Sequence, residues 1–347
     1  MMNLNFKQFL RKQVVKNSIA NFVSQIVLLL ITTVFIMYIS RKLSKTELAL
    51  YALMQILQSI FLITYLGLPT AAIKLIPEAQ AKSEENKVRN IIQITLYFPI
   101  FVGILLVIIG LFFSDNISEI FLKSKEYTKY IPLLLINVLL MGLYDRITLL
   151  LQALQKFITI SILNIVYYLL QRLLAIIFLF KFGLEGIFYG FLLGAIVSIG
   201  IGLLHLKNYL IFSFYNSIDI LKYSFPYWLQ GIARFGFTQV DQLIIGILFK
   251  PEVLAGYFIA KKIISLIILA FDSVLQVFIP KLSEIKARGI GFYKTNKPKI
   301  NKLFMVAILL VSFILLIQGK FFLFILGGEN YIHGVSVLNF LVLYLLS

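Results

Sequence analysis

The sequence contains no cysteine, which excludes disulfide bonds and thiolate chemistry. It has only two histidines, His205 and His333, and both lie near the ends of apolar segments rather than beside other candidate metal ligands. No glycine-rich phosphate loop and no nucleophile triad occurs either. We therefore expect no catalytic residue, no metal site and no cofactor, and the sequence does not predict an enzyme.

Charged residues are also scarce, at 14% of the chain compared with about 25% in soluble domains. In their place the chain has 60% hydrophobic residues and a mean hydropathy of +0.95. Its apolar runs reach the roughly 20 residues that a helix needs to cross a bilayer, and they lack the ten-residue alternation of barrel strands. The sequence predicts an all-α, polytopic membrane helix bundle.

Nine complete spans are expected, six before a linker at 205–217 and three after it. A tenth apolar segment, 335–347, has 13 residues and is too short to cross, so we expect that the chain ends inside a span or that this segment is re-entrant. The predicted lobes are 1–217, with six spans, and 218–347, with three spans and part of a fourth. The complete spans are 18–40, 48–73, 90–113, 131–154, 157–180, 184–204, 224–249, 253–279 and 303–326.

One short pattern occurs twice, as Lys45-x-Glu47-x-Ala49-x-Tyr51 and as Lys250-x-Glu252 followed by Ala255-x-Tyr257. Each copy leads into an apolar stretch that ends on Ile-Pro, at Ile76-Pro77 and at Ile279-Pro280. The alanines and the tyrosines are 206 residues apart and the prolines 203. This spacing favours an internal duplication, as in transporters with two related halves, although short matches also arise by chance in a biased sequence.

The net charge of +17 would suggest nucleic-acid binding in a soluble chain, but here the basic residues lie mainly in loops between spans. With the N-terminus inside, eighteen Lys and Arg fall in cytoplasmic segments and nine in the opposite loops. Since excess Lys and Arg marks the cytoplasmic side, we expect a multi-pass protein of the cell membrane with a cytoplasmic N-terminus. We expect membrane lipids as partners and no nucleic-acid partner. Two basic stretches, at 77–89 and 280–302, are expected to contact either lipid headgroups or solvent.

Ionisable groups at bilayer depth cost at least about 2.5 kcal/mol to insert and usually face a partner or a watery cavity. Arg234 and Asp241 are seven residues apart, two helical turns, so they share one face of their span. Gln171 lies beside Arg172 on the fifth span, and the first span carries a polar stripe of Ser18, Asn21, Gln25 and Thr32. The charged candidates are Asp145, Arg146, Arg172, Arg234, Asp241, Lys261, Lys262 and Asp272.

From these groups we predict a substrate-binding cavity and an ion-coupling site. The alternative is that the polar groups only hold helices together and that Lys261 reaches outward to the interface. Five basic against three acidic groups favour an anionic cargo, and the planar arginine fork suits phosphate oxygens. The predicted cavity residues are Arg172, Arg234, Asp241, Gln25, Asn21, Gln171 and Lys261, and the predicted ion-coupling residues are Asp241, Asp145 and Asp272.

The chain resembles the polysaccharide-biosynthesis flippases (Wzx-like) of the multidrug/oligosaccharidyl-lipid/polysaccharide exporter (MOP) superfamily. The family's glycine two residues before the tyrosine is alanine in both copies here. The motifs that carry the resemblance run through the chain: Arg41-x-Leu43-x-x-x-Glu47-x-Ala49-x-Tyr51-Ala52-Leu53, Gly67-Leu68-Pro69, Ser224-Phe225-Pro226, Asp241-x-Leu243-x-x-Gly246, Ala255-x-Tyr257-x-x-Ala260 and Leu326-Gly327-Gly328-Glu329-x-Tyr331.

The resemblance implies a two-lobed transporter with six helices per lobe and a central cavity that opens alternately to each side. It implies that a polyprenyl-(pyro)phosphate-linked oligosaccharide is flipped to the outer leaflet, with glycan polymerases or glycosyltransferases as partners. Three alternatives stay open. One is a cation-coupled multidrug-type exporter, which would bury more carboxylates than bases; the others are a membrane-bound glycan polymerase or glycosyltransferase, and an inactive truncated flippase.

Overall fold

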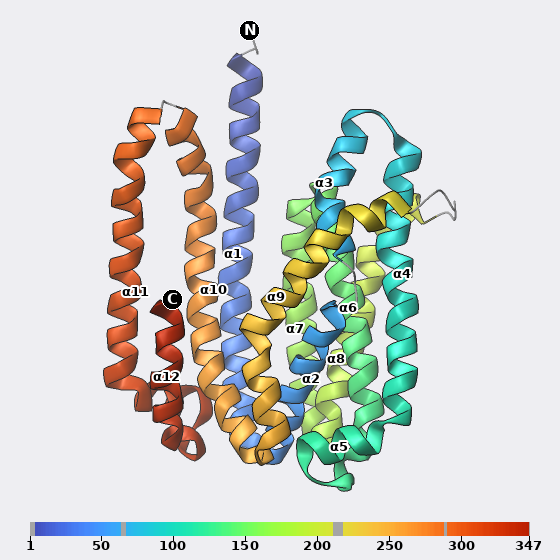
Figure 1. Cartoon of the computed structure of the whole chain (residues 1–347), viewed down its shortest axis with the longest axis vertical. Coiled ribbons are helices and arrows are strands. Elements are labelled where there is room, and N and C mark those ends of the chain that lie inside the picture. Colours follow the sequence, from blue (N-terminus) through green and yellow to red (C-terminus); the bar gives the residue numbers. More distant parts are fainter. Residues whose placement is uncertain (1–3, 64–66, 211–217, 288–289, 347) are drawn as a thin grey trace. The chain divides into compact units, whose positions relative to one another are not determined.

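The computed structural model describes the backbone of residues 4–63, 67–210, 218–287 and 290–346 (Figure 1). Side chains are described from Asn21 onward, except at 62, 218–219, 275–297, 299–301 and 344–346. In these ranges every regular element is helical, which confirms the all-α prediction. The α-helices are α1 (Leu4–Lys42), α2 (Lys45–Ile63), α3 (Leu68–Ala81), α4 (Glu85–Phe112), α5 (Ser114–Leu122), α6 (Ile131–Ala153), α7 (Phe157–Phe182), α8 (Leu184–Leu204), α9 (Ile218–Leu248), α10 (Pro251–Ala287), α11 (Ile290–Gly327) and α12 (Val335–Leu346). The short 3₁₀ helices are η1 (Lys125–Tyr130), η2 (Lys207–Tyr209) and η3 (Glu329–Gly334).

Seven segments of the described chain are long and apolar enough to cross a membrane. Two of the nine predicted spans are not among them. The 48–73 segment is divided between α2 and α3, and the 224–249 segment lies in α9, a continuous helix that ends at Leu248 and whose polar residues lower its hydropathy. The seven are Asn21–Lys42, Glu85–Phe112, Lys125–Ala153, Phe157–Phe182, Leu184–Leu204, Pro251–Val274 and Lys302–Gly327.

The chain forms two compact units, which are described separately. Unit 1 comprises Met1–Lys42 and Gly256–Ser347, and unit 2 comprises Leu43–Ala255. Unit 2 therefore holds α2 to α9, and its core is a set of buried Leu, Ile, Ala and Tyr side chains from α3, α4, α6, α7 and α8. The predicted division into lobes at 1–217 and 218–347 stays a prediction.

The repeated sequence pattern marks the beginnings of two helices. Ser44 and Glu47 form a reciprocal cap at the start of α2: the Ser44 amide donates to Glu47 Oε2 (2.8 Å) and the Glu47 amide donates to Ser44 Oγ (3.2 Å). In the second copy Pro251 occupies the first position of α10, where its missing N–H has no helical partner to lose. Ala49 and Ala255 are both fully buried in the first turns of these helices. The Ile-Pro pairs do not end these helices: α2 already ends at Ile63, Ile76-Pro77 lies inside α3, and α10 continues past Ile279-Pro280 to Ala287.

A glycine separates α2 from α3 and lets α9 pass close by. Gly67 has φ +66°, and a Cβ atom there would lie 2.5 Å from the carbonyl oxygen of Ser224 on α9. The indole Nε1 of Trp228 donates to the Ile63 carbonyl oxygen at the end of α2 (2.9 Å). On α3, a hydrogen bond with Tyr223 raises the pKa of Lys74. The Gly67-Leu68-Pro69 and Ser224-Phe225-Pro226 motifs therefore meet in one helix crossing.

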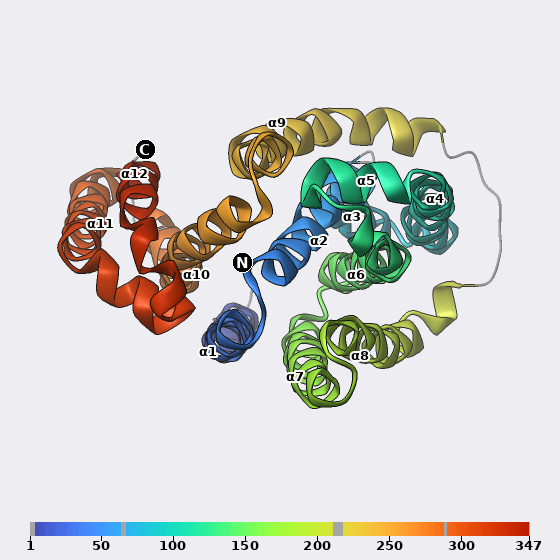
Figure 2. The same cartoon turned by 90° about the horizontal axis from the view of Figure 1, so that it is seen from below.

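Helices α7 and α8 form the closest helix pair of unit 2, and Figure 2 shows them side by side. Gly186, Gly190 and Gly194 repeat every four residues along α8 and face the α7 backbone. A Cβ at Gly190 would lie 2.2 Å from the Ala175 nitrogen, and one at Gly194 would lie 2.7 Å from the Gln171 nitrogen. A small-xxx-small stripe of this kind lets two membrane helices approach at backbone distance.

In unit 1 the end of α1 closes the end of α11. Arg41 donates from Nη2 to the carbonyl oxygens of Phe324 (2.9 Å) and Ile325 (2.6 Å), and Ser40 Oγ donates to the Leu326 carbonyl oxygen (2.7 Å). These are the carbonyls that a helix C-terminus leaves without an intrahelical partner, and a cation there also complements the helix dipole. Gly328, with φ +80°, turns the chain out of α11. Arg41 and the Gly327-Gly328 motif thus together form the C-terminal cap of α11.

Candidate functional site

The most enclosed charged group among the predicted site residues is Arg172, near the middle of α7. Arg172 is 6% exposed and Gln171 is fully buried. Arg172 Nη1 donates to Gln171 Oε1 (3.3 Å), and Gln171 Nε2 donates to the Phe191 carbonyl oxygen on α8 (3.2 Å). The α7–α8 glycine contact thus places a guanidinium and an amide in the interior of unit 2.

Aromatic rings surround this guanidinium. Its central carbon lies 4.8 Å from the centroid of the Phe191 ring and 5.5 Å from that of Tyr168. A cation over a ring face gains about 2 kcal/mol when both are desolvated, so the rings offset part of the cost of removing the charge from water. Arg172 is therefore held in one orientation between α7 and α8.

A second aromatic group connects α7 to α6. Tyr144 and Tyr167 stack with ring centroids 3.5 Å apart and an interplanar angle of 4°, and Tyr168 meets Tyr167 edge-on at 5.1 Å. The Tyr144 hydroxyl donates to Asn164 Oδ1 (2.7 Å), which fixes the stack along the helix axes. These contacts join α7 to α6, the helix that holds Asp145.

Asp145 lies on α6, half-buried, and accepts a hydrogen bond at Oδ2 from Gln58 Nε2 of α2 (3.4 Å). Tyr168 lies within electrostatic range of both Asp145 and Arg172, and its ring centroid is 5.5 Å from the central carbon of the guanidinium, so we group these residues together. Arg146, the next residue, is 2% exposed. We call Gln58, Asp145, Tyr168, Gln171, Arg172 and Phe191 the Arg172 cluster.

Arg234 and Asp241 lie on α9, on a different helix from the Arg172 cluster. The helix is continuous between them, so the predicted spacing of two turns is present. Arg234 is exposed and Asp241 is half-buried, with its Oδ1 accepting from the Gln242 amide (2.7 Å). Arg234 is thus free of the aromatic enclosure that surrounds Arg172.

The remaining predicted residues belong to unit 1. Asn21 and Gln25 are half-buried on α1, where the side chain of Ser18 lies outside the described residues. Lys261 is half-buried on α10, with Nζ 5.8 Å from the centroid of the Tyr257 ring, and Asp272 is exposed on the same helix. The predicted site residues are thus divided between the two units, and the structure gathers Arg172, Gln171 and Asp145 within unit 2.

Several residues of the Arg172 cluster were not predicted from the sequence. Gln58 and Phe191 gave no signal, because a single Gln or Phe in an apolar helix is ordinary. Tyr168 lies on the polar face of the fifth span with Gln171, one turn before Arg172, so its position was readable from the sequence, whereas its ring contact with the guanidinium was not predicted. Within the part of the chain that the structure describes, no group of His, Asp and Glu could hold a metal ion.

The arrangement of helices is shared with solved transporter structures. An outward-facing multidrug resistance MATE family transporter of the MOP superfamily superposes with a TM-score of 0.69 at 16% identity, over 96% of this chain and 79% of that one. The inward-facing form gives 0.70 at 16% identity, over 95% and 81%. A MOP superfamily transporter from Pyrococcus furiosus, described as having a binding pocket of reversed polarity, gives 0.67 at 15% identity, over 96% and 79%. At these identities the likeness shows the fold.

The sequence itself was compared with curated proteins and with family models. No match to a curated protein was found. The model of the polysaccharide biosynthesis protein family matches residues 14–286, well over half of the chain. Together with the fold, this confirms the predicted family and the expected multi-pass membrane helix bundle. The chain belongs to the polysaccharide biosynthesis protein family.

Proposed function

We propose that the protein moves a polyprenyl-(pyro)phosphate-linked oligosaccharide from the cytoplasmic to the outer leaflet of the cell membrane by alternating access. The observation that carries the proposal is the family match over residues 14–286. In this proposal the sugar headgroup passes through a watery cavity while the polyprenyl tail stays in lipid. Glycan polymerases or glycosyltransferases would act on the delivered product.

The charged side chains support an anionic cargo. A guanidinium holds two phosphate oxygens at once, which suits a pyrophosphate in a low-dielectric cavity. Arg234 is exposed on α9 and can meet a ligand, whereas Arg172 is enclosed by Tyr168 and Phe191. We therefore assign phosphate contact to Arg234 and a positioning role to Arg172. Lys261, Asn21 and Gln25 would supply further polar contacts.

Flipping of a fluorescent lipid-linked oligosaccharide between the two leaflets can be measured in proteoliposomes. A membrane-impermeant quencher removes the fluorescence of the molecules in the outer leaflet, and further loss reports molecules that arrive there. Wild-type protein should expose the fluorophore far faster than empty vesicles, and Arg234→Ala should abolish this. Lys250→Ala, an exposed change just beyond the end of α9, is the matched control and should leave the rate unchanged. Wild-type transport no faster than in empty vesicles would refute the proposal.

A cation-coupled multidrug-type exporter is the second candidate, because the solved structures with this fold include multidrug resistance transporters. Asp145, Asp241 and Asp272 are the carboxylates we assign to coupling in either case. Efflux of a lipophilic cation such as ethidium from the same vesicles separates the two cargoes. Asp241→Asn and Asp145→Asn should each weaken the response to a proton or sodium gradient, and an unchanged response would remove that residue from coupling.

The proposed orientation places the N-terminus in the cytoplasm. Since the sequence has no cysteine, a single introduced cysteine is the only thiol in the protein. Lys82→Cys, at the end of α3, should be shielded from a membrane-impermeant maleimide in intact cells. Lys125→Cys, at the start of η1, should be labelled. The opposite result would reverse the orientation.

A further inference from the structure

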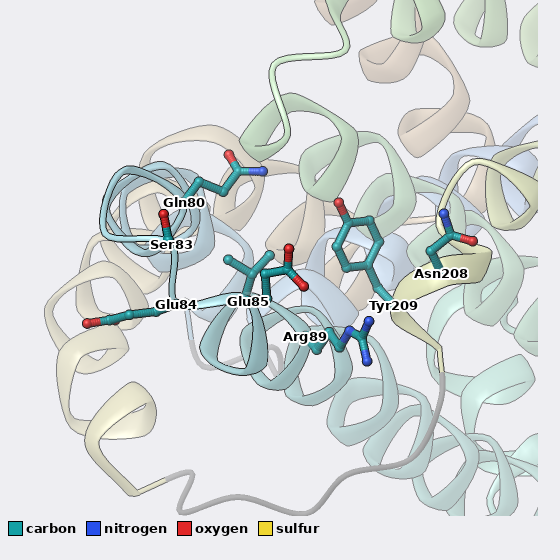
Figure 3. Close-up of a pocket in the computed structure, with 8 residues that line it drawn as sticks. Gln80, Ser83, Glu84, Glu85, Arg89, Asn208 and Tyr209 are labelled. Carbon is teal, nitrogen blue, oxygen red and sulfur yellow. The ribbon is translucent and has the colours of Figure 1, made fainter.

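A polar cavity of about 380 Å³ opens in unit 2 between the turn that joins α3 to α4 and the short helix η2 (Figure 3). None of the residues that line it belongs to the Arg172 cluster or to α9. Its lining is polar apart from one valine, and it contains two carboxylates and one guanidinium. The lining residues are Gln80, Ser83, Glu84, Glu85, Val88, Arg89, Asn208 and Tyr209.

The cavity lies at the level of the lipid headgroups. Helix α4 has 28 residues and is therefore about 42 Å long, whereas the hydrocarbon core is about 30 Å thick. The first turns of α4 carry Glu85, Lys87 and Arg89, so we expect this charged end to be the one that extends beyond the hydrocarbon. The candidate span of α8 ends at Leu204, immediately before η2, so both walls of the cavity stand at span ends.

Hydrogen bonds hold the two walls in place. Gln93 Nε2 donates to the carbonyl oxygen of Tyr209 (3.0 Å), and the Tyr97 hydroxyl donates to that of Leu210 (3.1 Å). On the other side Ser83 takes φ +58°, and the Glu84 amide donates back to the Ala79 carbonyl oxygen (3.0 Å). The cavity is therefore built into the fold before any ligand arrives.

Opposite charges face this cavity without neutralising one another. Glu85 and Arg89 are one turn apart on α4, and neither makes an ion pair or side-chain hydrogen bond within the described parts of the chain. Figure 3 shows both beside Tyr209 and Asn208 of η2, with Gln80 above them. Glu84 differs, because it points away in Figure 3 and pairs with Lys87 at 3.0 Å.

These charges decide the class of ligand. A simple anion would be attracted by Arg89 but repelled by Glu85. A simple cation would be attracted by Glu85 but repelled by Arg89, and a neutral sugar would compensate neither charge. A small zwitterion compensates both, and charge-assisted hydrogen bonds to a primary ammonium and to a phosphate are stronger than neutral ones. We propose that this cavity binds the phosphoethanolamine group, with its ammonium at Glu85 and its phosphate at Arg89.

The group could arrive on a phosphatidylethanolamine molecule of the surrounding bilayer or as a soluble compound. Full-length protein would be placed in nanodiscs of equal parts phosphatidylethanolamine, phosphatidylcholine and phosphatidylglycerol, and lipid retained after extraction would be counted by native mass spectrometry. We expect at least tenfold preferential retention of phosphatidylethanolamine, because phosphatidylcholine lacks N–H donors and phosphatidylglycerol lacks the cation. Calorimetry with soluble phosphoethanolamine tests the second source. If the protein both binds soluble phosphoethanolamine and retains the lipid, the headgroup is sufficient for binding. If it binds soluble phosphoethanolamine without retaining the lipid, the cavity is a site for a soluble ligand.

Glu85→Gln and Arg89→Gln should each reduce retention or binding at least tenfold while the thermal transition stays close to wild type, since Glu85 is exposed, Arg89 is half-buried and neither side chain is in the core. Lys82→Gln, on the same turn but outside the lining, is the matched control and should retain the wild-type preference. Equal retention of the three lipids together with no binding of soluble phosphoethanolamine would overturn the proposal. So would a preference that both cavity variants preserve. Neither outcome depends on what the protein transports.

Discussion

The central carbon of the Arg172 guanidinium lies 4.8 Å from the centroid of the Phe191 ring, across the contact between α7 and α8. The two residues lie on consecutive antiparallel helices and meet because glycines on α8 let the helices approach. The ring covers one face of a charge that would otherwise be costly at this depth. This pairing gives the first of four predictions.

Arg172→Ala should destabilise the protein by about 2 to 3 kcal/mol, because it removes the cation from its rings and leaves the Gln171 amide oxygen without that donor. Arg172→Lys should be intermediate, since an ammonium keeps the charge but not the planar stack. Lys181→Ala, exposed on the same helix, should stay within about 0.5 kcal/mol of wild type. Thermal unfolding followed by size-exclusion chromatography measures all three, and an unchanged midpoint for Arg172→Ala would contradict the enclosure described here.

Gly190→Ala should destabilise the α7–α8 pair by at least about 2 kcal/mol, because the new methyl group would lie 2.2 Å from the Ala175 nitrogen, on a backbone that cannot move aside. Gly200→Ala lies further along α8 with nothing within 4 Å. That control should be neutral or stabilising by up to about 1 kcal/mol, since alanine is the better helix former. The difference between the two unfolding midpoints is the measurement, and equal midpoints would argue against close packing of these helices.

Gly67→Ala combines two penalties, a left-handed backbone at φ +66° and a methyl group 2.5 Å from the Ser224 carbonyl oxygen. Gly183→Ala meets no atom within 4 Å, and its backbone, with φ +59° and ψ −142°, lies in a region that only glycine adopts readily, so this variant measures backbone strain alone. We expect about 1 to 3 kcal/mol of destabilisation for Gly183→Ala and at least about 2 kcal/mol for Gly67→Ala. If Gly67→Ala unfolds at the wild-type temperature, α9 does not press on this turn.

Arg41→Gln should loosen the end of α11 and lower stability by about 1 to 3 kcal/mol, because it removes charged donors from the Phe324 and Ile325 carbonyl oxygens. Ser40→Ala should cost about 1 kcal/mol, mainly through the lost hydrogen bond to the Leu326 carbonyl oxygen. Lys42→Gln, exposed at the adjacent position, is the control. Hydrogen exchange at 324–331 should rise in Arg41→Gln and not in Lys42→Gln; protection that stays at the wild-type level would remove Arg41 from this role.

Long apolar runs made the helices predictable one by one. A run of about 20 apolar residues can satisfy its backbone hydrogen bonds in a membrane only as a helix, so the all-α class followed from composition. The period of the helix also placed Arg234 and Asp241 on one face. Periodicity did not predict the helix break at Gly67, just before α3 begins. A helix can contain a glycine within an apolar run, so the sequence alone does not show that Gly67 has a positive φ.

The sequence by itself determined that this chain is a membrane-spanning helix bundle with more basic than acidic groups in its predicted spans, and its motifs pointed to the family. Only the tertiary structure decided which of those groups meet. Phe191 of α8 covers the Arg172 guanidinium of α7, and Gln58 of α2 donates to Asp145, 87 residues later in the sequence. The physical reason is that helical period sets the face on which a side chain lies, whereas the helix opposite that face is chosen by close packing between segments distant in sequence.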